Sequence, residues 1–256
     1  MATDIRVTEV QDQLTTILNQ VKEQSNNQCR LVAVSKTKPV EDILAAYQIG
    51  QRHFGENIQE LVEKAEKLPK DINWHFIGNY STTIKLLGAI QSNKLKFLAS
   101  IPNLYVIETL DSFKKAQMLN KLCAERASPL KVFIQVNTSG EECKTIKPLI
   151  CIAKSGVTAD ESLVLAQQII SECPNIKLDG LMTIGSFESS HIESEPNPDF
   201  EKLKVCRQRI QQQYGLEGLE LSMGMSDDFI KAIHQGSTNV RVGSSIFGKR
   251  NYNTSA

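Results

Sequence analysis

Short β-rich runs of apolar residues alternate along the chain with longer stretches in which apolar residues recur at helical spacing. Such runs predict strands, and the stretches between them predict amphipathic helices. The predicted strands are 31–35, 51–55, 72–77, 104–109, 132–137, 178–184, 219–223 and 239–243. The predicted helices are 8–24, 40–49, 57–67, 112–126, 160–172, 198–213 and 226–235.

This alternation predicts an α/β fold built from βαβ units around a parallel sheet. Eight strands in such a series favour closure into a (β/α)8 TIM barrel. A chain of 256 residues with 41% apolar content suits this barrel as a single domain, so we expect one domain over residues 1–256.

In barrels of this type the chemistry collects at the carboxyl ends of the strands, and a phosphate is often held after strands 7 and 8. The predicted strands place Lys36 after strand 1, Asn57 after strand 2 and His75 in strand 3. Ser222 to Ser226 follow strand 7, and Gly243 with Ser244 follows strand 8. The sequence therefore predicts a reactive amine and a phosphate cradle at the same mouth.

Lys36 directly follows the apolar run 31–35, so its stem would leave the packed barrel and its amine would face the mouth. Partial desolvation lowers the pKa of a lysine, and the neutral amine is the form that condenses with an aldehyde. The alternative is an ordinary solvated lysine at a strand end. Lys38 can project on the same side, or it can be an exposed charge before Pro39.

The stretch 236–248 brackets the last strand with glycines and serines, which allow close backbone approach to a phosphate. Ser222 and Ser244 could add hydroxyl donors, although ordinary turn chemistry also explains such a pattern. Arg241 interrupts this strand, and an arginine there needs a partner, either a carboxylate or a ligand ring nitrogen. For His75, the alternative to a site role is a packed histidine with a local hydrogen bond.

The charge balance narrows the classes of partner. With 29 Lys and Arg against 29 Asp and Glu, no overall positive field favours nucleic acid or an anionic membrane. The N-terminus lacks the apolar run of an export signal and no stretch is long enough to span a membrane, so we expect a cytoplasmic protein. Six scattered cysteines without a C-x-x-C pair suggest reduced thiols, and no metal-ligand spacing or G-x-S-x-G elbow is present.

Beyond this physical reading, six motifs follow one another along the chain: Arg30 to Pro39 (RLVAVSKTKP), Phe54 to Glu60 (FGENIQE), Trp74 to Gly78 (WHFIG), Gly180 to Gly185 (GLMTIG), Leu221 to Ser226 (LSMGMS) and Ser237 to Gly248 (STNVRVGSSIFG). With these motifs in this order, the chain resembles the pyridoxal 5'-phosphate (PLP) homeostasis proteins, also called the YggS or proline synthase co-transcribed homologue family. The resemblance implies a PLP barrel like the N-terminal domain of alanine racemase, the fold type III of PLP proteins, with a Schiff base on Lys36. The predicted cofactor-binding set is Lys36, Asn57, His75, Ser222, Arg241, Gly243 and Ser244, with no catalytic residue and no metal.

The resemblance also implies a carrier that buffers PLP or delivers it to PLP-dependent apo-enzymes, as a monomer or weak dimer. A racemase-like architecture places an arginine beside the pyridine nitrogen, where a cation disfavours ring protonation and weakens the electron sink; Arg241 is the candidate. The second base of a racemase comes from a further domain, and the chain stops at Ala256. The alternatives are a PLP-dependent racemase-like enzyme and an interaction module without cofactor.

Two segments depart from the family pattern, 79–88 after the third predicted strand and 143–153 after the fifth. Back-translation allows a removable piece in each to begin with GT and end with AG, and the two pieces have the same length. Their removal restores the motifs Ile-Gly-Ala-Ile-Gln and Gly-Glu-Glu-Ser-Lys-Ser-Gly. The segments are therefore either genuine loop insertions at the barrel mouth or short unspliced introns, and the transcript sequence distinguishes the two.

Overall fold

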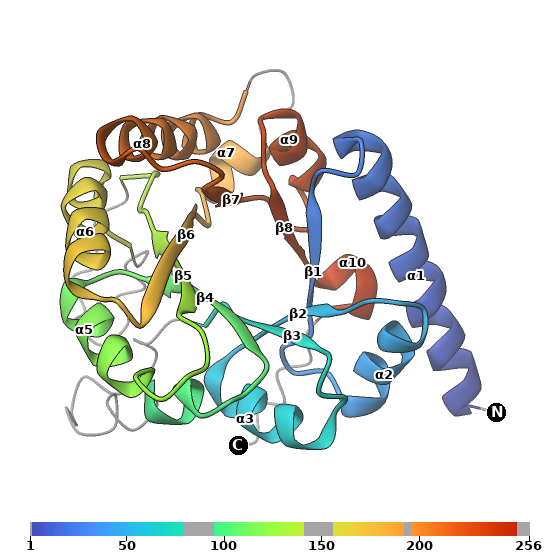
Figure 1. The fold of residues 1–256 in the computed structure, drawn as a ribbon. Coiled ribbons are helices and arrows are strands. Elements are labelled where there is room, and N and C mark those ends of the chain that lie inside the picture. The colour runs from blue at the N-terminus through green and yellow to red at the C-terminus, as the bar shows by residue number, and fades with distance from the viewer. Residues whose placement is uncertain (1, 79–94, 141–155, 192–195, 250–256) are drawn as a thin grey trace, which may run out of the picture.

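Eight parallel strands close into a barrel in a computed structural model, which describes residues 2–78, 95–140, 156–191 and 196–249 (Figure 1). The strands follow one another around the barrel in chain order, and β1 pairs with β8 to close it. This confirms the predicted (β/α)8 fold. The strands are β1 (Arg30–Val34), β2 (His53–Glu56), β3 (Asn73–Phe76), β4 (Leu104–Leu110), β5 (Leu130–Gln135), β6 (Ile176–Met182), β7 (Glu220–Ser222) and β8 (Asn239–Val242).

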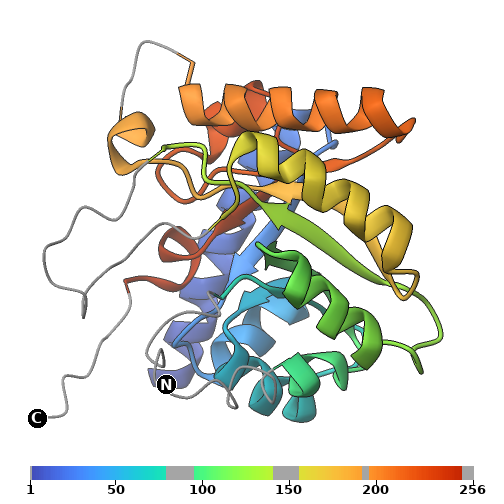
Figure 2. The same cartoon turned by 90° about the vertical axis from the view of Figure 1, so that its left-hand side faces the viewer.

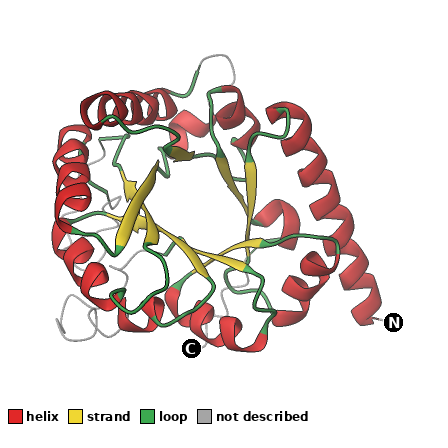
Figure 3. Cartoon of the chain, in the orientation of Figure 1, coloured by secondary structure: helices red, strands yellow, loops and turns green. Residues whose placement is uncertain are grey.

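Helices surround the ring of strands (Figure 3). Figure 2 shows α6 and α8 packed side by side on one flank, whereas α1 packs against α2, α9 and α10 where the two ends of the barrel meet. Residues 95–99 are also helical. The helices are α1 (Ala2–Ser25), α2 (Val40–Gln48), α3 (Ile58–Lys67), α5 (Phe113–Leu122), α6 (Ala159–Glu172), α7 (Phe187–His191), α8 (Pro198–Tyr214), α9 (Phe229–His234) and α10 (Ser244–Phe247).

Each predicted strand overlaps an observed one, and the differences lie at the ends. β2 begins at His53 instead of residue 51 because the backbone N–H of Gln51 still donates to Ala46 O at the end of α2. α9 begins at Phe229 instead of residue 226, because Asp228 Oδ1 accepts from Met225 N and holds the preceding residues in a turn. The short helices α7 and α10 were not predicted.

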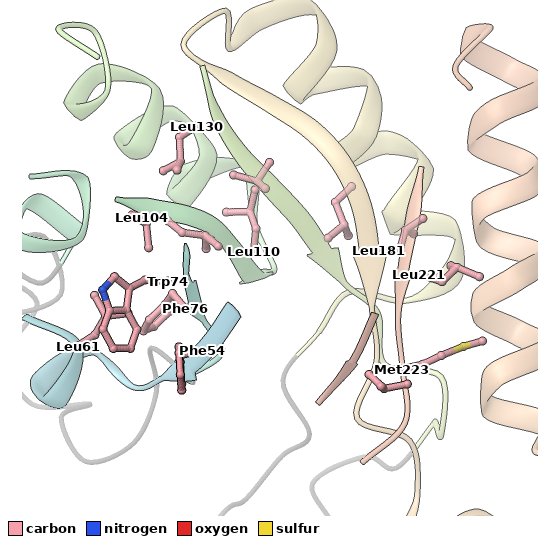
Figure 4. Close-up of a cluster of buried hydrophobic side chains, with 14 of the residues drawn as sticks. Phe54, Leu61, Trp74, Phe76, Leu104, Leu110, Leu130, Leu181, Leu221 and Met223 are labelled. Carbon is pink, nitrogen blue, oxygen red and sulfur yellow. The ribbon is translucent and has the colours of Figure 1, made fainter. Parts of the chain in front are cut away.

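Apolar side chains fill two separate layers. The larger layer lies between strands and helices, where Trp74 and Phe76 of β3 pack with Phe54 and Leu61 (Figure 4). The smaller one, inside the barrel, contains Val106, Phe133 and Met182, with Tyr105 and Ile184 packed against them. Alternation along β3 and β8 turns His75 and Arg241 toward the interior instead. The interior is therefore part apolar and part polar.

Segments 79–88 and 143–153 lie outside the described residues. Within the described part of the chain, no helix is long and apolar enough to cross a membrane. The four cysteines described, Cys29, Cys123, Cys173 and Cys206, are free thiols.

Candidate functional site

A cavity of about 340 Å³ lies at the carboxyl ends of the strands, within the range of about 300–1,000 Å³ common for small-molecule sites. Residues from β1, β6 and β8 and from the segments after β1, β3, β6, β7 and β8 form its wall. The described lining residues are Val34, Lys36, Lys38, Ile77, Met182, Ile184, Met225, Ser226, Asp227, Arg241, Gly243, Ser244 and Gly248.

The charges in this lining favour an anionic ligand. Lys36, Lys38 and Arg241 contribute positive charge, and Asp227 contributes one carboxylate. The apolar residues of the wall exclude water on the other sides and strengthen these electrostatic interactions. The cavity can therefore bind a small molecule that is apolar in part and negatively charged at one end.

Lys36 lies just beyond β1 and is half-buried. Its Nζ donates to Ile77 O at 3.1 Å, across the ends of β1 and β3. The Lys38 Nζ points elsewhere and donates to Lys249 O at 2.9 Å. Both lysines line the cavity, and Lys36 is the one whose amine contacts the residue that follows β3.

Arg241 is 5% exposed and forms part of the cavity floor. One guanidinium nitrogen donates to Ser222 Oγ at 2.6 Å, and another donates to Thr183 O at 2.8 Å. Burial lowers the pKa of Arg241, and the nearby carboxylates of Glu108 and Asp228 oppose this shift. These two bonds fix the plane of the guanidinium while leaving other N–H donors for a ligand.

Glu108 of β4 lies fully buried beneath Arg241, 3.9 Å from its guanidinium. Its Oε2 accepts from Ser222 Oγ at 2.5 Å, and its Oε1 accepts from Asn239 Nδ2 at 3.1 Å. His75 Nδ1 lies 2.6 Å from the same Oε1. Burial raises the pKa of this carboxyl, but His75 and Arg241 outweigh burial, so the pKa is lowered overall.

Two histidines, His53 and His75, extend this network away from Glu108. Burial lowers the pKa of His53 to about 3, so this imidazole is neutral at pH 7. The Asn73 amide nitrogen lies 3.5 Å from His53 Nε2, and His53 Nδ1 lies 2.9 Å from His75 Nε2. His75 Nδ1 in turn faces Glu108 Oε1, so the two imidazoles connect to the carboxylate below Arg241.

The seven residues predicted from the sequence lie at different depths. Lys36, Arg241, Gly243 and Ser244 line the cavity. Ser222 lies below it, fully buried, with its hydroxyl proton directed to Glu108. The other two, His75 and Asn57, are outside the described lining.

His75 lies in the barrel interior with no exposed surface, and its hydrogen-bond partner Glu108 comes from the neighbouring strand β4. Asn57 caps α3: its Oδ1 accepts from Glu60 N at 3.2 Å, and its Nδ2 donates to Glu60 Oε1 at 2.7 Å. Both contacts lie in the first turn of α3, directly after the end of β2.

Sequence reasoning did not find Glu108, the carboxylate on which the interior network converges. The signal was present, because Glu108 stands in the otherwise apolar run 104–110, as Arg241 stands in β8. A charge in such a run requires a partner. Applied to both residues, this argument would have suggested that they pair.

At the other end of the cavity, Gly243 brings the end of β8 against β1. A Cβ on Gly243 would lie 3.1 Å from Val34 O and 3.2 Å from Val34 Cβ, closer than normal contact. The glycine lets α10 begin directly at the cavity, with Ser244 at its first position and Ser226 Oγ 3.4 Å from Gly243 N. The first N–H groups of a helix have no partner within the helix, so they can donate to an anion here.

Comparison with known proteins places the chain in one family. Residues 11–251 match the model for the alanine racemase N-terminal domain. A pyridoxal phosphate homeostasis protein of Caenorhabditis elegans is 48% identical over 238 residues, covering 90% of this chain and 89% of that protein. The human protein of the same name is 43% identical over 235 residues, covering 88% of this chain and 78% of its own length.

Solved structures agree with the fold. A protein of unknown function from Bifidobacterium adolescentis superposes with a TM-score of 0.76 at 31% identity, covering 95% of this chain and 96% of its own. PipY of Synechococcus elongatus, solved with PLP bound, has a TM-score of 0.71 at 28% identity, covering 93% of this chain and 100% of its own. Alanine racemase of Corynebacterium glutamicum, at 13% identity and a TM-score of 0.62, covers 95% of this chain and 62% of its own and shares the fold.

Proposed function

The chain belongs to the family of pyridoxal phosphate homeostasis proteins, and on this premise we propose that its cavity holds PLP for storage or delivery in the cytoplasm. The observation that supports this proposal most strongly is the pairing of two cations across one cavity. The Lys36 amine comes from the turn after β1, and the Arg241 guanidinium comes from β8. A phosphate cradle at the start of α10 completes the set.

The residues present fit PLP. The aldehyde needs an amine within a partly dry wall, which Lys36 beside Ile77 and Val34 provides. The phosphate needs N–H and hydroxyl donors, which Gly243 and Ser244 at the start of α10 provide, and the ring fits between apolar walls that include Met182 and Ile184. Lys36 would hold the aldehyde through its amine, in a condensation that releases one water. When bound, PLP would supply an electron-withdrawing pyridine ring.

Arg241 is the residue that we expect to contact the pyridine ring. Its guanidinium, held by Ser222 and Thr183, would meet the pyridine nitrogen as a hydrogen-bond donor with a positive charge. A cation at this position disfavours protonation of the ring, so the ring withdraws fewer electrons from a bound amine. The arrangement suits a protein that holds PLP and performs little chemistry with it.

Lys36→Ala tests the covalent attachment. The wild-type protein, incubated with PLP and reduced with borohydride, should carry a stable PLP adduct on Lys36, located by peptide mass spectrometry. Lys36→Ala should lose both the adduct and the absorbance of the carbon–nitrogen double bond. Lys38→Ala is the matched control and should keep both. An adduct of undiminished yield in Lys36→Ala, or one located on Lys38 in the wild type, contradicts the assignment.

A second experiment separates a carrier from a racemase-like enzyme. The PLP-loaded protein is incubated with alanine in deuterated buffer, and loss of the α-proton is followed by NMR. A carrier should show almost no exchange above the background of free PLP. Delivery is tested by mixing the loaded protein with a PLP-dependent apo-enzyme and comparing its reactivation rate with that produced by the same concentration of free PLP.

A further inference from the structure

Three charged residues outside the cavity surround the turn that carries Lys36. Lys64 of α3 is buried, and its Nζ donates to Glu56 Oε1 at 2.6 Å and to Glu60 Oε2 at 2.8 Å. Glu56 ends β2 with no exposed surface, and Glu60 lies in the first turn of α3. Neither Glu56 nor Lys64 is among the described residues that line the cavity. We call these three residues the α3 cluster.

The α3 cluster contacts the backbone on both sides of Lys36. On the N-terminal side, Lys64 Nζ donates to Ser35 O at 2.9 Å, and Ser35 Oγ donates to Glu56 Oε1 at 2.8 Å. On the C-terminal side, Thr37 N donates to Glu60 Oε2 at 2.6 Å. Lys36 therefore sits between two residues that are each tied to the same ion cluster.

The turn needs such support because its backbone is strained. Thr37 has a φ of 65°, in the left-handed region that β-branched residues rarely adopt. The β-ladder ends before it, since Ser35 N donates to Gly55 O and Lys38 N already folds back to Ser35 O. Without the Glu60 carboxylate, nothing among the described contacts of Thr37 N would favour this conformation.

The attraction between the Lys64 amine and the carboxylates of Glu56 and Glu60 helps to hold the α3 cluster together. Burial raises the pKa of Glu56, and Lys64 opposes the shift. Burial also raises the pKa of Glu60, but there the hydrogen bond and charge of Lys64 outweigh it, so the pKa is lowered overall. Asn57 adds a further restraint, since its amide holds the second oxygen of Glu60.

We propose that Glu56, Glu60 and Lys64 are positioning residues that hold the 35–38 turn so that the Lys36 amine faces the aldehyde of a bound PLP. The inference rests on the proposed function. It also gives Asn57 a place in the site, because Asn57 orients Glu60, which holds Thr37. Such a cluster acts on the reaction of the amine and leaves the binding of the phosphate and ring largely unchanged.

The test compares Lys64→Met with Lys67→Met, an exposed lysine three residues further along the same helix. Two ligands are used: PLP, which can react with Lys36, and pyridoxine 5'-phosphate, which lacks the aldehyde and can only bind. The rate of covalent trapping is measured by adding borohydride at successive times after mixing with PLP and quantifying the reduced adduct. Binding of pyridoxine 5'-phosphate is measured by calorimetry. Glu60→Gln serves as a second variant that keeps the shape of the side chain, and circular dichroism verifies that each variant is folded.

Lys64→Met should slow trapping by about ten- to a hundredfold, because small misplacements of a reacting group have effects of this size. Glu60→Gln should slow it less, Lys67→Met should match the wild type, and all should bind pyridoxine 5'-phosphate with nearly wild-type affinity. Trapping at the wild-type rate in folded Lys64→Met and Glu60→Gln overturns the proposal, as does an equal loss for both ligands. A wild-type protein that binds neither ligand overturns the proposed function itself.

Discussion

Two of the cations that line the cavity, Lys36 and Arg241, are supported in different ways. Lys36 belongs to a turn, and the α3 cluster outside the barrel fixes the backbone on either side of it. Arg241 belongs to a strand whose backbone is already fixed by the ladder to β1, and its side chain is held by Ser222 and Thr183 above Glu108. The turn needs contacts that define its conformation, whereas the strand residue needs contacts that compensate its buried charge. The two supports should therefore fail differently.

Glu108→Ala should have the largest effect on stability. It leaves the buried Arg241 charge without its carboxylate, and it removes the acceptor shared by the Ser222 hydroxyl, the Asn239 amide and the His75 ring. Breaking a buried ion pair by removing one partner costs about 3–5 kcal/mol. The unfolding free energy from urea titration should fall by this amount, and a loss below about 1 kcal/mol would show that the interior network is not what compensates Arg241.

Lys64→Met should cost less, about 2 kcal/mol, because Glu60 is partly exposed and the raised pKa of Glu56 lets it take up a proton. Lys67→Met is the control, with a change within about 0.5 kcal/mol expected for an exposed site. Urea titrations of both variants measure the difference. If Lys64→Met costs as much as Glu108→Ala, the contrast between the two supports is wrong.

Mild acid should weaken the interior network before the α3 cluster. The pKa of His53 is lowered from 6.5 to about 3, first by burial and then by His75. Between these values the unfolded chain binds more protons at this residue, so stability is lost as the pH falls below about 6.5, by at most about 1.4 kcal/mol per pH unit. The lowered pKa of Glu60 affects stability only below the usual carboxyl range, near 4.5.

His53→Asn checks this pH dependence. The variant should show a flatter unfolding free energy between pH 6.5 and pH 5 than the wild type, because the titrating group is gone. Thermal or urea unfolding at several pH values gives the slope. Equal slopes in the two proteins would mean that another group controls the acid response.

Thr37→Gly should produce the smallest effect, and a favourable one. Glycine adopts the left-handed conformation of residue 37 without strain, although it is also more flexible in the unfolded chain, so a net gain of about 0.5 kcal/mol is expected. Asn26→Gly is the matched control, since Asn26 also has a positive φ but asparagine tolerates it, and little change is expected. A destabilised Thr37→Gly would show that the turn is not strained.

Much of this organisation could be predicted from the sequence because each strand is marked by its own residues. The run 31–35 locates β1 and puts Lys36 at its carboxyl end, and the apolar neighbours of Arg241 reveal that it faces an interior. These are local signals, and the barrel closure follows from the number of strands. The depth of Ser222 and His75 was not predicted, because it depends on which side chain of another strand reaches each of them.

The pairings that matter most connect distant parts of the chain. Glu108 meets Ser222 and Asn239 only because β4 lies across the barrel interior from β7 and β8. The role of Asn57 as a helix cap depends on Glu60, and the importance of Glu60 depends on a turn after a different strand. α10 was missed because four residues carry too little periodicity to mark a helix.

Closure of the barrel between β1 and β8 also sets an order of events for a newly made chain. The two strands pair Leu31 with Val240 and Val32 with Arg241, so the last ladder forms between residues separated by almost the whole described sequence. Contacts of such long range form late in folding. The cavity combines Lys36 with Arg241 and so does not exist in a partly folded chain. A ligand that binds only there favours the completed barrel, by about 2.7 kcal/mol when present at a hundred times its dissociation constant.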